Sequence, residues 1–293
     1  MYRISVVITS YRRNAAIVDR AIKSVINQTY PIFEILVVDD NGGDDIFSPQ
    51  LSSLCKKYGN VVYINRNKNV GACAARNIGI SLAKGELVAF LDDDDEWLPK
   101  KIEAQLLVYE KNTHNKIGMV FCSGFVNDKN TNQIYDYYNC KSNTNPDFPY
   151  LLKYDCIGST SQALIKREVF NSVGGFWEAL PARQDYEMWI RISQHYSIYG
   201  TNEKLFIYHI HQDEQITKGK KNAFVGNWLI FRRYKKYYRR DIIARYYLFD
   251  RLFKNIYKFD FRSIYVVFRR IIIIPIWFFY LLFRKLKGKE NEQ

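Results

Sequence analysis

The chain has 293 residues, of which 47% are hydrophobic and 25% are charged, so it can bury one large α/β domain or two small ones. Residues 220–293 contain 19 of the 43 Lys and Arg but only 5 of the 30 Asp and Glu, so this segment carries +14 and residues 1–219 carry −1. The five scattered cysteines form no C-x-x-C pair, which argues against a disulfide framework or a zinc site and favours a reducing compartment.

Strands and helices alternate in the first third of the chain. Apolar, largely β-branched runs predict strands at residues 4–9, 33–38, 61–64 and 87–91, and helical periodicity predicts helices at 15–26 and, interrupted by Gly79, at 71–83. We interpret the N-terminal residues as a strand and not as a signal peptide. This order predicts right-handed crossovers and a doubly wound parallel sheet.

Polar residues follow three of these strands, at residues 9–13, 39–40 and 92–95. Because the carboxyl ends of parallel strands meet at one edge of a sheet, we expect the three clusters to converge there. The four consecutive carboxylates of residues 92–95 repel one another, and a hard cation such as Mg²⁺ or Mn²⁺ would offset that repulsion. The alternative is an exposed acidic turn that caps the next helix, but the convergence favours a metal and nucleotide site.

The second third is less regular and predicts a mixed sheet. Strands are expected at 119–126 and 133–138 as an antiparallel pair, and at 161–166, 197–199 and 205–210, with helices at 148–152, 167–173 and 185–195. We therefore expect a body at residues 1–219, with a nucleotide-binding half at 1–97 and an acceptor half at 98–219, followed by a basic helical tail at 220–293.

Six motifs in order resemble those of the family 2 glycosyltransferases. They are VVITSYRR (6–13), VVDD (37–40), NVG with ARN (69–71 and 75–77), FLDDDDEW (90–97), GGF (174–176) and QDYEMW (184–189). The resemblance spans residues 3–215, and six motifs in order are a far more specific signal than any one of them. It implies the GT-A fold, an inverting reaction, a nucleotide-sugar donor that is normally a UDP-sugar, and Mn²⁺ or Mg²⁺ on its diphosphate.

The resemblance also implies roles for individual residues. For the donor nucleotide it implies Thr9, Tyr11, Arg13, Asp39, Arg76, Asp92 and Asp93; for the metal Asp94 and Asp95, with His211 as a further candidate; for the acceptor Trp177, Glu178 and Gln184; and for the catalytic base Asp185. Two positions depart from the family pattern, since Gln184 stands where an acidic residue is usual and His209 where an arginine is usual. His209 and His211 are equally well explained as strand histidines that are hydrogen-bonded in the core.

The implied chemistry is consistent with these residue types. A cation neutralises the charge that develops on the leaving diphosphate, and a carboxylate takes the proton of the attacking hydroxyl. We expect a hexosyltransferase-type enzyme of bacterial surface polysaccharide biosynthesis, acting on a saccharide or lipid-linked saccharide. One alternative is a non-catalytic nucleotide- or glycan-binding module of the same fold. Another is a nucleotidyltransferase, although residues 10–14 lack the glycine-rich phosphate loop that such enzymes normally have.

The basic tail contains a 13-residue apolar block at residues 271–283 that is flanked by Lys and Arg clusters. It is shorter than the roughly 20 residues that a membrane span needs. The pattern is typical of an amphipathic helix on an anionic membrane surface, so we expect a cytoplasmic protein, peripheral on the inner face of the cell membrane. The alternatives are a helical subdomain packed on the body, or a nucleic-acid surface, which the flanked apolar block makes the less favoured.

Overall fold

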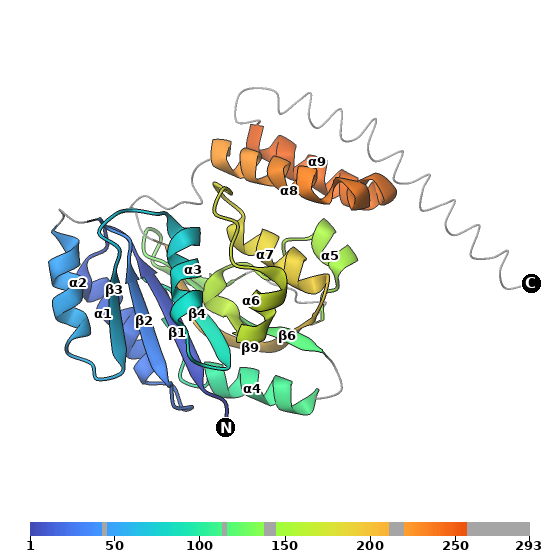
Figure 1. Cartoon of the computed structure of the whole chain (residues 1–293). Coiled ribbons are helices and arrows are strands. Elements are labelled where there is room, and N and C mark those ends of the chain that lie inside the picture. The colour runs from blue at the N-terminus through green and yellow to red at the C-terminus, as the bar shows by residue number, and fades with distance from the viewer. Residues whose placement is uncertain (43–45, 113–115, 138–144, 211–219, 257–293) are drawn as a thin grey trace, which may run out of the picture. The chain divides into compact units, whose positions relative to one another are not determined.

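The computed structural model of the chain describes residues 1–42, 46–112, 116–137, 145–210 and 220–256 (Figure 1). It divides into two compact units. The first, which we call the sheet unit, comprises Met1–Leu151, Asp155–Ala179 and Gln184–Glu214. The second, the helical unit, comprises Leu152–Tyr154, Leu180–Arg183 and Gln215–Gln293.

The sheet unit is built on one mixed sheet. In the described residues its strands are β1 (Ile4–Ser10), β2 (Glu34–Asp39), β3 (Val61–Asn65), β4 (Leu87–Asp92), β5 (Glu96–Trp97), β6 (Ile117–Asp128), β7 (Gln133–Asp136), β8 (Ala163–Lys166) and β9 (Ser197–Ile210), in the order β3-β2-β1-β4-β8-β6-β9-β5 with β7 paired to β6. Strands β1 to β4 are parallel, β8 is antiparallel to β4 and β6, and β9 is parallel to β6. The predicted doubly wound mixed sheet is confirmed.

Helices cover both faces of this sheet. They are α1 (Ala15–Ile26), α2 (Phe47–Cys55), α3 (Ala72–Leu82), α4 (Lys101–Lys111), α5 (Phe148–Lys153), α6 (Arg167–Val173) and α7 (Gln184–Ser193), with a 3₁₀ turn at Thr160–Gln162. Successive residues of β1 point to opposite faces: Val6 and Ile8 join the core beside Ile22 of α1, and Val7 packs on α3.

Three details of the sheet unit correct the sequence interpretation. Helix α3 is continuous through Gly79, which was expected to interrupt it. The glycine is needed because α3 packs so closely on β1 that a Cβ atom there would lie 2.3 Å from Val7 Cγ1. The two short strands expected after residue 196 are one strand, β9, whose pairing with β6 shifts register. Cys156 is disulfide-bonded, although the scattered cysteines argued against a disulfide framework. Spacing along the chain does not show which cysteines meet in space.

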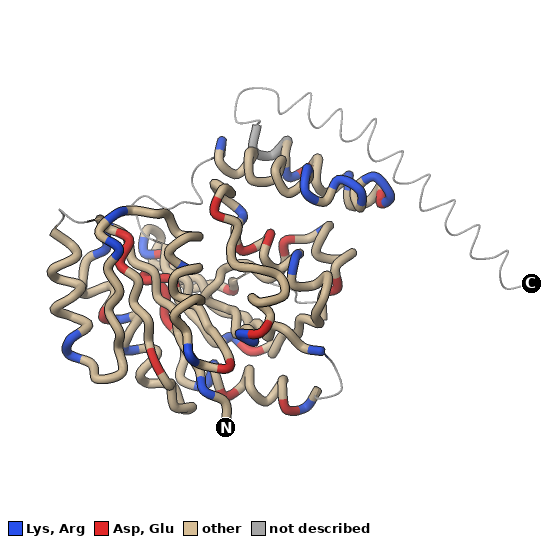
Figure 2. The backbone as a smooth tube through the Cα atoms, viewed as in Figure 1, with Lys and Arg blue, Asp and Glu red and all other residues tan. Residues whose placement is uncertain are grey.

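The helical unit contains α8 (Lys220–Arg240) and α9 (Ile242–Ile256), which pack against each other. Helix α8 bends at Tyr234, and the buried side chains between the helices include Ile230, Tyr238 and Leu248. Lys and Arg residues are concentrated in the C-terminal half of α8 (Figure 2). None of the described helices is both long and apolar enough to cross a membrane, and the apolar block at residues 271–283 lies outside the described residues.

The core of the sheet unit contains one fully buried cation, Lys101 on α4. Its Nζ lies 2.9 Å from Gln105 Oε1 and 3.9 Å from the centre of the Trp97 ring. Burial lowers the pKa of Lys101 to about 8, against its ordinary value of 10.5. Between these two values the unfolded chain keeps the proton that the folded protein loses, so stability rises with pH in that window.

We expect Lys101→Met to increase the free energy of unfolding at pH 7, by at most about 3 kcal/mol, because the cost of burying a charge disappears. The variant should also lose the rise in stability between pH 8 and 10. Urea denaturation at several pH values measures both effects, and Lys100→Met, which removes an exposed charge one residue earlier, is the matched control. Equal pH dependence of Lys101→Met and the wild-type protein would contradict this account.

Candidate active site

The ends of three neighbouring strands bring the predicted clusters together (Figure 1). In the parallel register, Thr9 of β1 pairs with Asp92 of β4, and Ser10 pairs with Asp39 of β2. Thr9, Asp39 and Asp92 therefore lie at one edge of the sheet, as the strand order from the sequence predicts. This edge is where open α/β sheets bind their ligands.

Asp92 is held by groups from two other elements. Its Oδ1 accepts from Arg76 Nη2 at 2.8 Å and from Thr160 Oγ1 at 3.1 Å, and its Oδ2 accepts from Ser159 Oγ at 3.2 Å. The sequence analysis did not single out Ser159 and Thr160, whose only signal is a pair of hydroxyls before the predicted strand at 161–166. Asp92 remains 29% exposed, so one side of the carboxylate stays accessible.

Asp93 and Asp94 share one arginine. Arg13 Nε lies 3.1 Å from Asp93 Oδ1, and Arg13 Nη2 lies 2.9 Å from Asp94 Oδ2. Even so, burial first and the charge of Asp93 second raise the pKa of Asp94 to about 7. The cluster therefore holds more negative charge than Arg13 neutralises, which is an arrangement that a further cation would stabilise.

Asp95 differs from its neighbours because it is fully buried. Its Oδ2 accepts from Ser161 Oγ at 2.6 Å, and burial raises its pKa well above the ordinary value. No set of three His, Cys, Asp or Glu side chains within the described residues is arranged to hold a metal alone, and His211 lies outside them. Mg²⁺ usually needs only one or two carboxylates when a substrate supplies phosphate oxygens, so Asp94 and the partly exposed Asp92 fit such an ion.

Asp39 is fully buried and already accepts several hydrogen bonds. Its Oδ1 accepts from the backbone N and the Nδ2 of Asn41, at 2.9 and 2.8 Å, and its Oδ2 accepts from the Tyr63 hydroxyl at 2.5 Å. Burial, followed by the Asp39 charge, raises the pKa of Tyr63. Tyr11 lies in the loop after β1 and is 46% exposed, and the Arg12 guanidinium lies 5.3 Å from the centre of its ring.

The second residue of the pair, Asp40, has a structural task that the sequence analysis did not assign. It is buried and accepts from the backbone N of Val70 at 2.6 Å and of Gly71 at 3.0 Å. Asn69 Nδ2 donates to its backbone carbonyl at 3.0 Å. Asp40 thereby ties the end of β2 to the start of α3, the helix that carries Arg76.

Asp185 lies in the first turn of α7, after Gln184, and is partly exposed. Although burial lowers the pKa of Arg76, the charges of Asp92 and, more weakly, Asp185 raise it, so both carboxylates act on the same guanidinium. Helix α7 is anchored by Arg191, which donates to Glu187 Oε2 at 2.8 Å and to the Val173 carbonyl at 2.6 Å. The hydrogen bond to Val173, at the end of α6, fixes the helix that presents Asp185, while the ion pair with Glu187 lies within α7.

The loop at residues 174–178 is bound to α3 by the amide side chain of Asn77, and the Arg76 guanidinium of the same helix lies 5.6 Å from the centre of the Phe176 ring. Asn77 Oδ1 accepts from Phe176 N at 2.7 Å, and Asn77 Nδ2 donates to Phe176 O at 3.0 Å and to Glu178 Oε1 at 2.8 Å. Gly175 is required because a Cβ atom there would lie 2.3 Å from Asn77 Oδ1. The predicted acceptor residues Trp177 and Glu178 are thus held beside α3, with Trp177 partly exposed.

His209, which stands where the family pattern usually has an arginine, lies on β9 and is buried. It is 3% exposed, and its Nε2 lies 2.6 Å from Glu96 Oε2. Arg20 completes this group, since its Nε lies 3.4 Å from the same carboxylate oxygen and its Nη2 donates to the Asp94 carbonyl at 2.6 Å. The arrangement matches the alternative of a strand histidine that is hydrogen-bonded in the core.

A doubly wound mixed sheet with a carboxylate cluster at the ends of its parallel strands defines a protein of the GT-A class. The chain belongs to glycosyl transferase family 2, because the model of the family "Glycosyl transferase family 2" matches residues 5–174. The predicted family is thereby confirmed.

The chain resembles the following three proteins in sequence or in structure. An uncharacterized glycosyltransferase of Rickettsia conorii is 49% identical over 111 residues, which are 38% of this chain and 18% of that protein. A protein of Escherichia coli K12, provisionally named as the colanic acid biosynthesis glycosyl transferase WcaA, is 28% identical over 234 residues, 75% of this chain and 77% of that protein. The crystal structure of S. aureus TarS 1-349 in complex with UDP-GlcNAc aligns with a TM-score of 0.61 at 16% identity, over 92% of this chain and 76% of that chain. This likeness confirms the predicted GT-A fold.

Proposed function

We propose that this chain is an inverting, metal-dependent hexosyltransferase that moves a sugar from a UDP-sugar to a saccharide or lipid-linked saccharide. The observation that carries the proposal is the convergence of Thr9, Asp39 and the carboxylates of residues 92–94 at one sheet edge. The UDP-GlcNAc bound to TarS supports a UDP-sugar donor, and the name of WcaA supports a role in bacterial surface polysaccharide biosynthesis.

In this proposal the nucleotide lies over the ends of β1 and β2. The exposed ring of Tyr11 stacks on the base, and Asp39 accepts a hydrogen bond from it. Asp92 and Arg76, which are paired at 2.8 Å, face the ribose and the diphosphate. Asn41 and Tyr63 already donate to Asp39, so they fix its carboxylate in one orientation before the base binds.

Asp94 is the residue that we propose to hold Mn²⁺ or Mg²⁺, with the fully buried Asp95 beside it. When bound, the ion supplies positive charge that stabilises the departing diphosphate. Asp185 accepts the proton of the acceptor hydroxyl as that oxygen attacks the anomeric carbon. Trp177, Glu178 and Gln184, from the loop and the helix next to Asp185, contact the acceptor.

The donor is tested by thermal unfolding with nucleotide sugars in the presence of Mn²⁺. We expect UDP-GlcNAc or another UDP-sugar at a hundredfold excess over its Kd to stabilise the protein by about 2.7 kcal/mol, which is a rise in Tm of several degrees. Matched GDP-sugars are the control for the base. The absence of any shift with every nucleotide sugar tested would contradict the proposal. Stabilisation without sugar transfer or donor hydrolysis would favour the non-catalytic binding module.

We also propose that the enzyme works at the cytoplasmic face of the cell membrane, because exposed cations cluster on α8. Each such charge contributes about 1 kcal/mol near an anionic surface. Replacing Arg232, Arg233, Lys235 and Lys236 with Gln should therefore weaken binding to phosphatidylserine-containing vesicles by roughly a hundredfold or more. Cosedimentation measures the binding, with phosphatidylcholine vesicles as the control. Equal binding of wild-type protein to both kinds of vesicle would contradict an electrostatic contact.

A further inference from the structure

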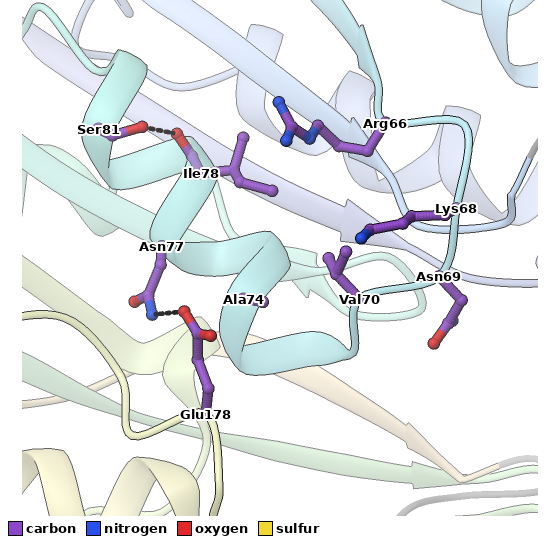
Figure 3. Close-up of a pocket in the computed structure, with 9 residues that line it drawn as sticks. All are labelled: Arg66, Lys68, Asn69, Val70, Ala74, Asn77, Ile78, Ser81 and Glu178. Carbon is purple, nitrogen blue, oxygen red and sulfur yellow. Dashed lines mark hydrogen bonds between the residues drawn. The ribbon is translucent and has the colours of Figure 1, made fainter.

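A groove of about 620 Å³ crosses the outer face of α3 in the sheet unit (Figure 3). Arg66 and Lys68, from the loop between β3 and α3, stand at one end, and Glu178 stands at the other. Apolar side chains of α3 and the residues before it, among them Val70 and Ile78, form the floor. Of these residues only Glu178 has a role in the function proposed above.

The two cations of the groove have no counter-ion among the residues that the structure describes. Within the part of the chain that the structure describes, neither Arg66 nor Lys68 makes an ion pair or a side-chain hydrogen bond, and both are exposed. Figure 3 shows that the side chains of Arg66 and Lys68 both extend from their loop toward α3. Two unpaired cations on one wall produce a local positive potential that attracts an anionic group.

The loop that carries these cations is fixed at both ends. At its start, Asn65 Oδ1 accepts from Asn67 N at 2.6 Å, and Asn67 has a left-handed φ of 53° that turns the chain. At its end, the buried Asp40 accepts from Val70 N and Gly71 N. A ligand that binds Arg66 and Lys68 therefore pays little to order the backbone of the loop.

The opposite end of the groove suits hydroxyl groups. Glu178 is exposed, and Asn77 Nδ2 holds its Oε1 at 2.8 Å, so the carboxylate is oriented while its other oxygen can accept from a ligand hydroxyl. An apolar floor with a polar rim matches a sugar ring, which has C–H groups on its faces and hydroxyls at its edge.

We infer that this groove binds an anionic saccharide, with its phosphate or carboxylate at Arg66 and Lys68 and its hydroxyls at Glu178. Because Glu178 follows Trp177 on the loop beside Asp185, the bound saccharide is part of the acceptor. The inference rests on the proposed transferase function and deepens it, since it assigns the acceptor a negative charge.

Ligand-observed saturation-transfer NMR on the full-length protein tests the inference. The probes are methyl glucuronide and glucose 6-phosphate as anionic sugars, methyl glucoside as the neutral sugar, and inorganic phosphate as the anion alone. We expect binding of one or both anionic sugars, with methyl glucoside weaker. The double variant Arg66→Gln/Lys68→Gln should bind them about fivefold or more weakly, because two exposed charge contacts are lost. Which of the two sugars binds distinguishes a carboxylate from a phosphate.

The matched control is Lys56→Gln/Lys57→Gln, which removes the same charge from exposed positions just after α2 and should bind the probes as the wild-type protein does. The inference would be overturned if the Arg66→Gln/Lys68→Gln variant bound the anionic sugars as tightly as the wild-type protein does, or if inorganic phosphate bound as tightly as glucose 6-phosphate. Stabilisation by UDP-GlcNAc with Mn²⁺, measured on the same variants, separates the two proposals. If the Arg66→Gln/Lys68→Gln variant is the one form that UDP-GlcNAc no longer stabilises, the two cations belong to the donor site. In that case the acceptor inference fails and the proposed transferase function stands. If no form of the protein responds to any nucleotide sugar, the proposed function itself fails.

Discussion

Asp185→Asn is expected to reduce the rate of sugar transfer by roughly a hundredfold or more, the range for losing a general base. The asparagine amide has nearly the same shape as the carboxylate but cannot accept a proton. The first turn of α7 should persist, because Tyr186 N can donate to the side-chain oxygen of asparagine as it does to Asp185 Oδ1 at 2.7 Å. The hydrogen bond from Arg191 to the Val173 carbonyl, which anchors the helix, is untouched by the change.

Donor binding should survive this substitution, because the groups proposed to bind the nucleotide lie at the ends of β1, β2 and β4. The measurement is the release of UDP from the donor, with an acceptor or with water as the nucleophile, together with the thermal shift by the donor. Asp136→Asn is the control, since Asp136 is an exposed carboxylate on β7 that pairs with Lys204. Wild-type turnover of Asp185→Asn would remove Asp185 from the role of base.

The parallel half of the fold could be predicted from the sequence because three of its strands, β1, β2 and β4, are buried on both faces. Such strands are continuous apolar runs, and the register of β1 with β2 and β4 then places Thr9, Asp39 and Asp92 side by side without further information. The second half was predicted less well. Strand β9 was read as two strands because residues 200–204 are polar or glycine, and β5 has two residues and forms only by pairing with β9.

The contacts within the site could not be predicted, since they join residues far apart in the chain. Arg13 was expected at the nucleotide and lies 80 residues from its ion-pair partner Asp93. Ser159 and Thr160 bind Asp92 across a similar separation, and Asn77 binds the backbone of Phe176 across 99 residues. A local pattern identifies which residues are polar at a strand end, but only the packed sheet determines which of them meet.

The carboxylate cluster at the end of β4 is the basis of a second prediction, on how the donor and Mn²⁺ stabilise the protein. Asp94→Ala is expected to abolish the part of the donor-induced stabilisation that depends on Mn²⁺, because the substitution removes the side chain proposed to bind the ion. At a hundredfold excess of donor over its Kd, the donor raises the free energy of unfolding of the wild-type protein by about 2.7 kcal/mol, which is the most that the variant can lose. Removing Mn²⁺ from the wild-type protein with a chelator should have the same effect, and the variant should then show no further loss.

The same substitution should leave the ligand-free protein about as stable as the wild type, which separates a lost metal ligand from a damaged fold. Arg13 keeps its ion pair with Asp93 at 3.1 Å, and the repulsion that helps to raise the pKa of Asp94 to about 7 disappears with the carboxylate. Asp136→Ala is the control for the loss of a carboxylate elsewhere in the sheet unit, and its Mn²⁺-dependent shift should equal that of the wild type. A full Mn²⁺-dependent shift in Asp94→Ala would exclude Asp94 as the ligand, and the partly exposed Asp92 would then be the carboxylate to replace next.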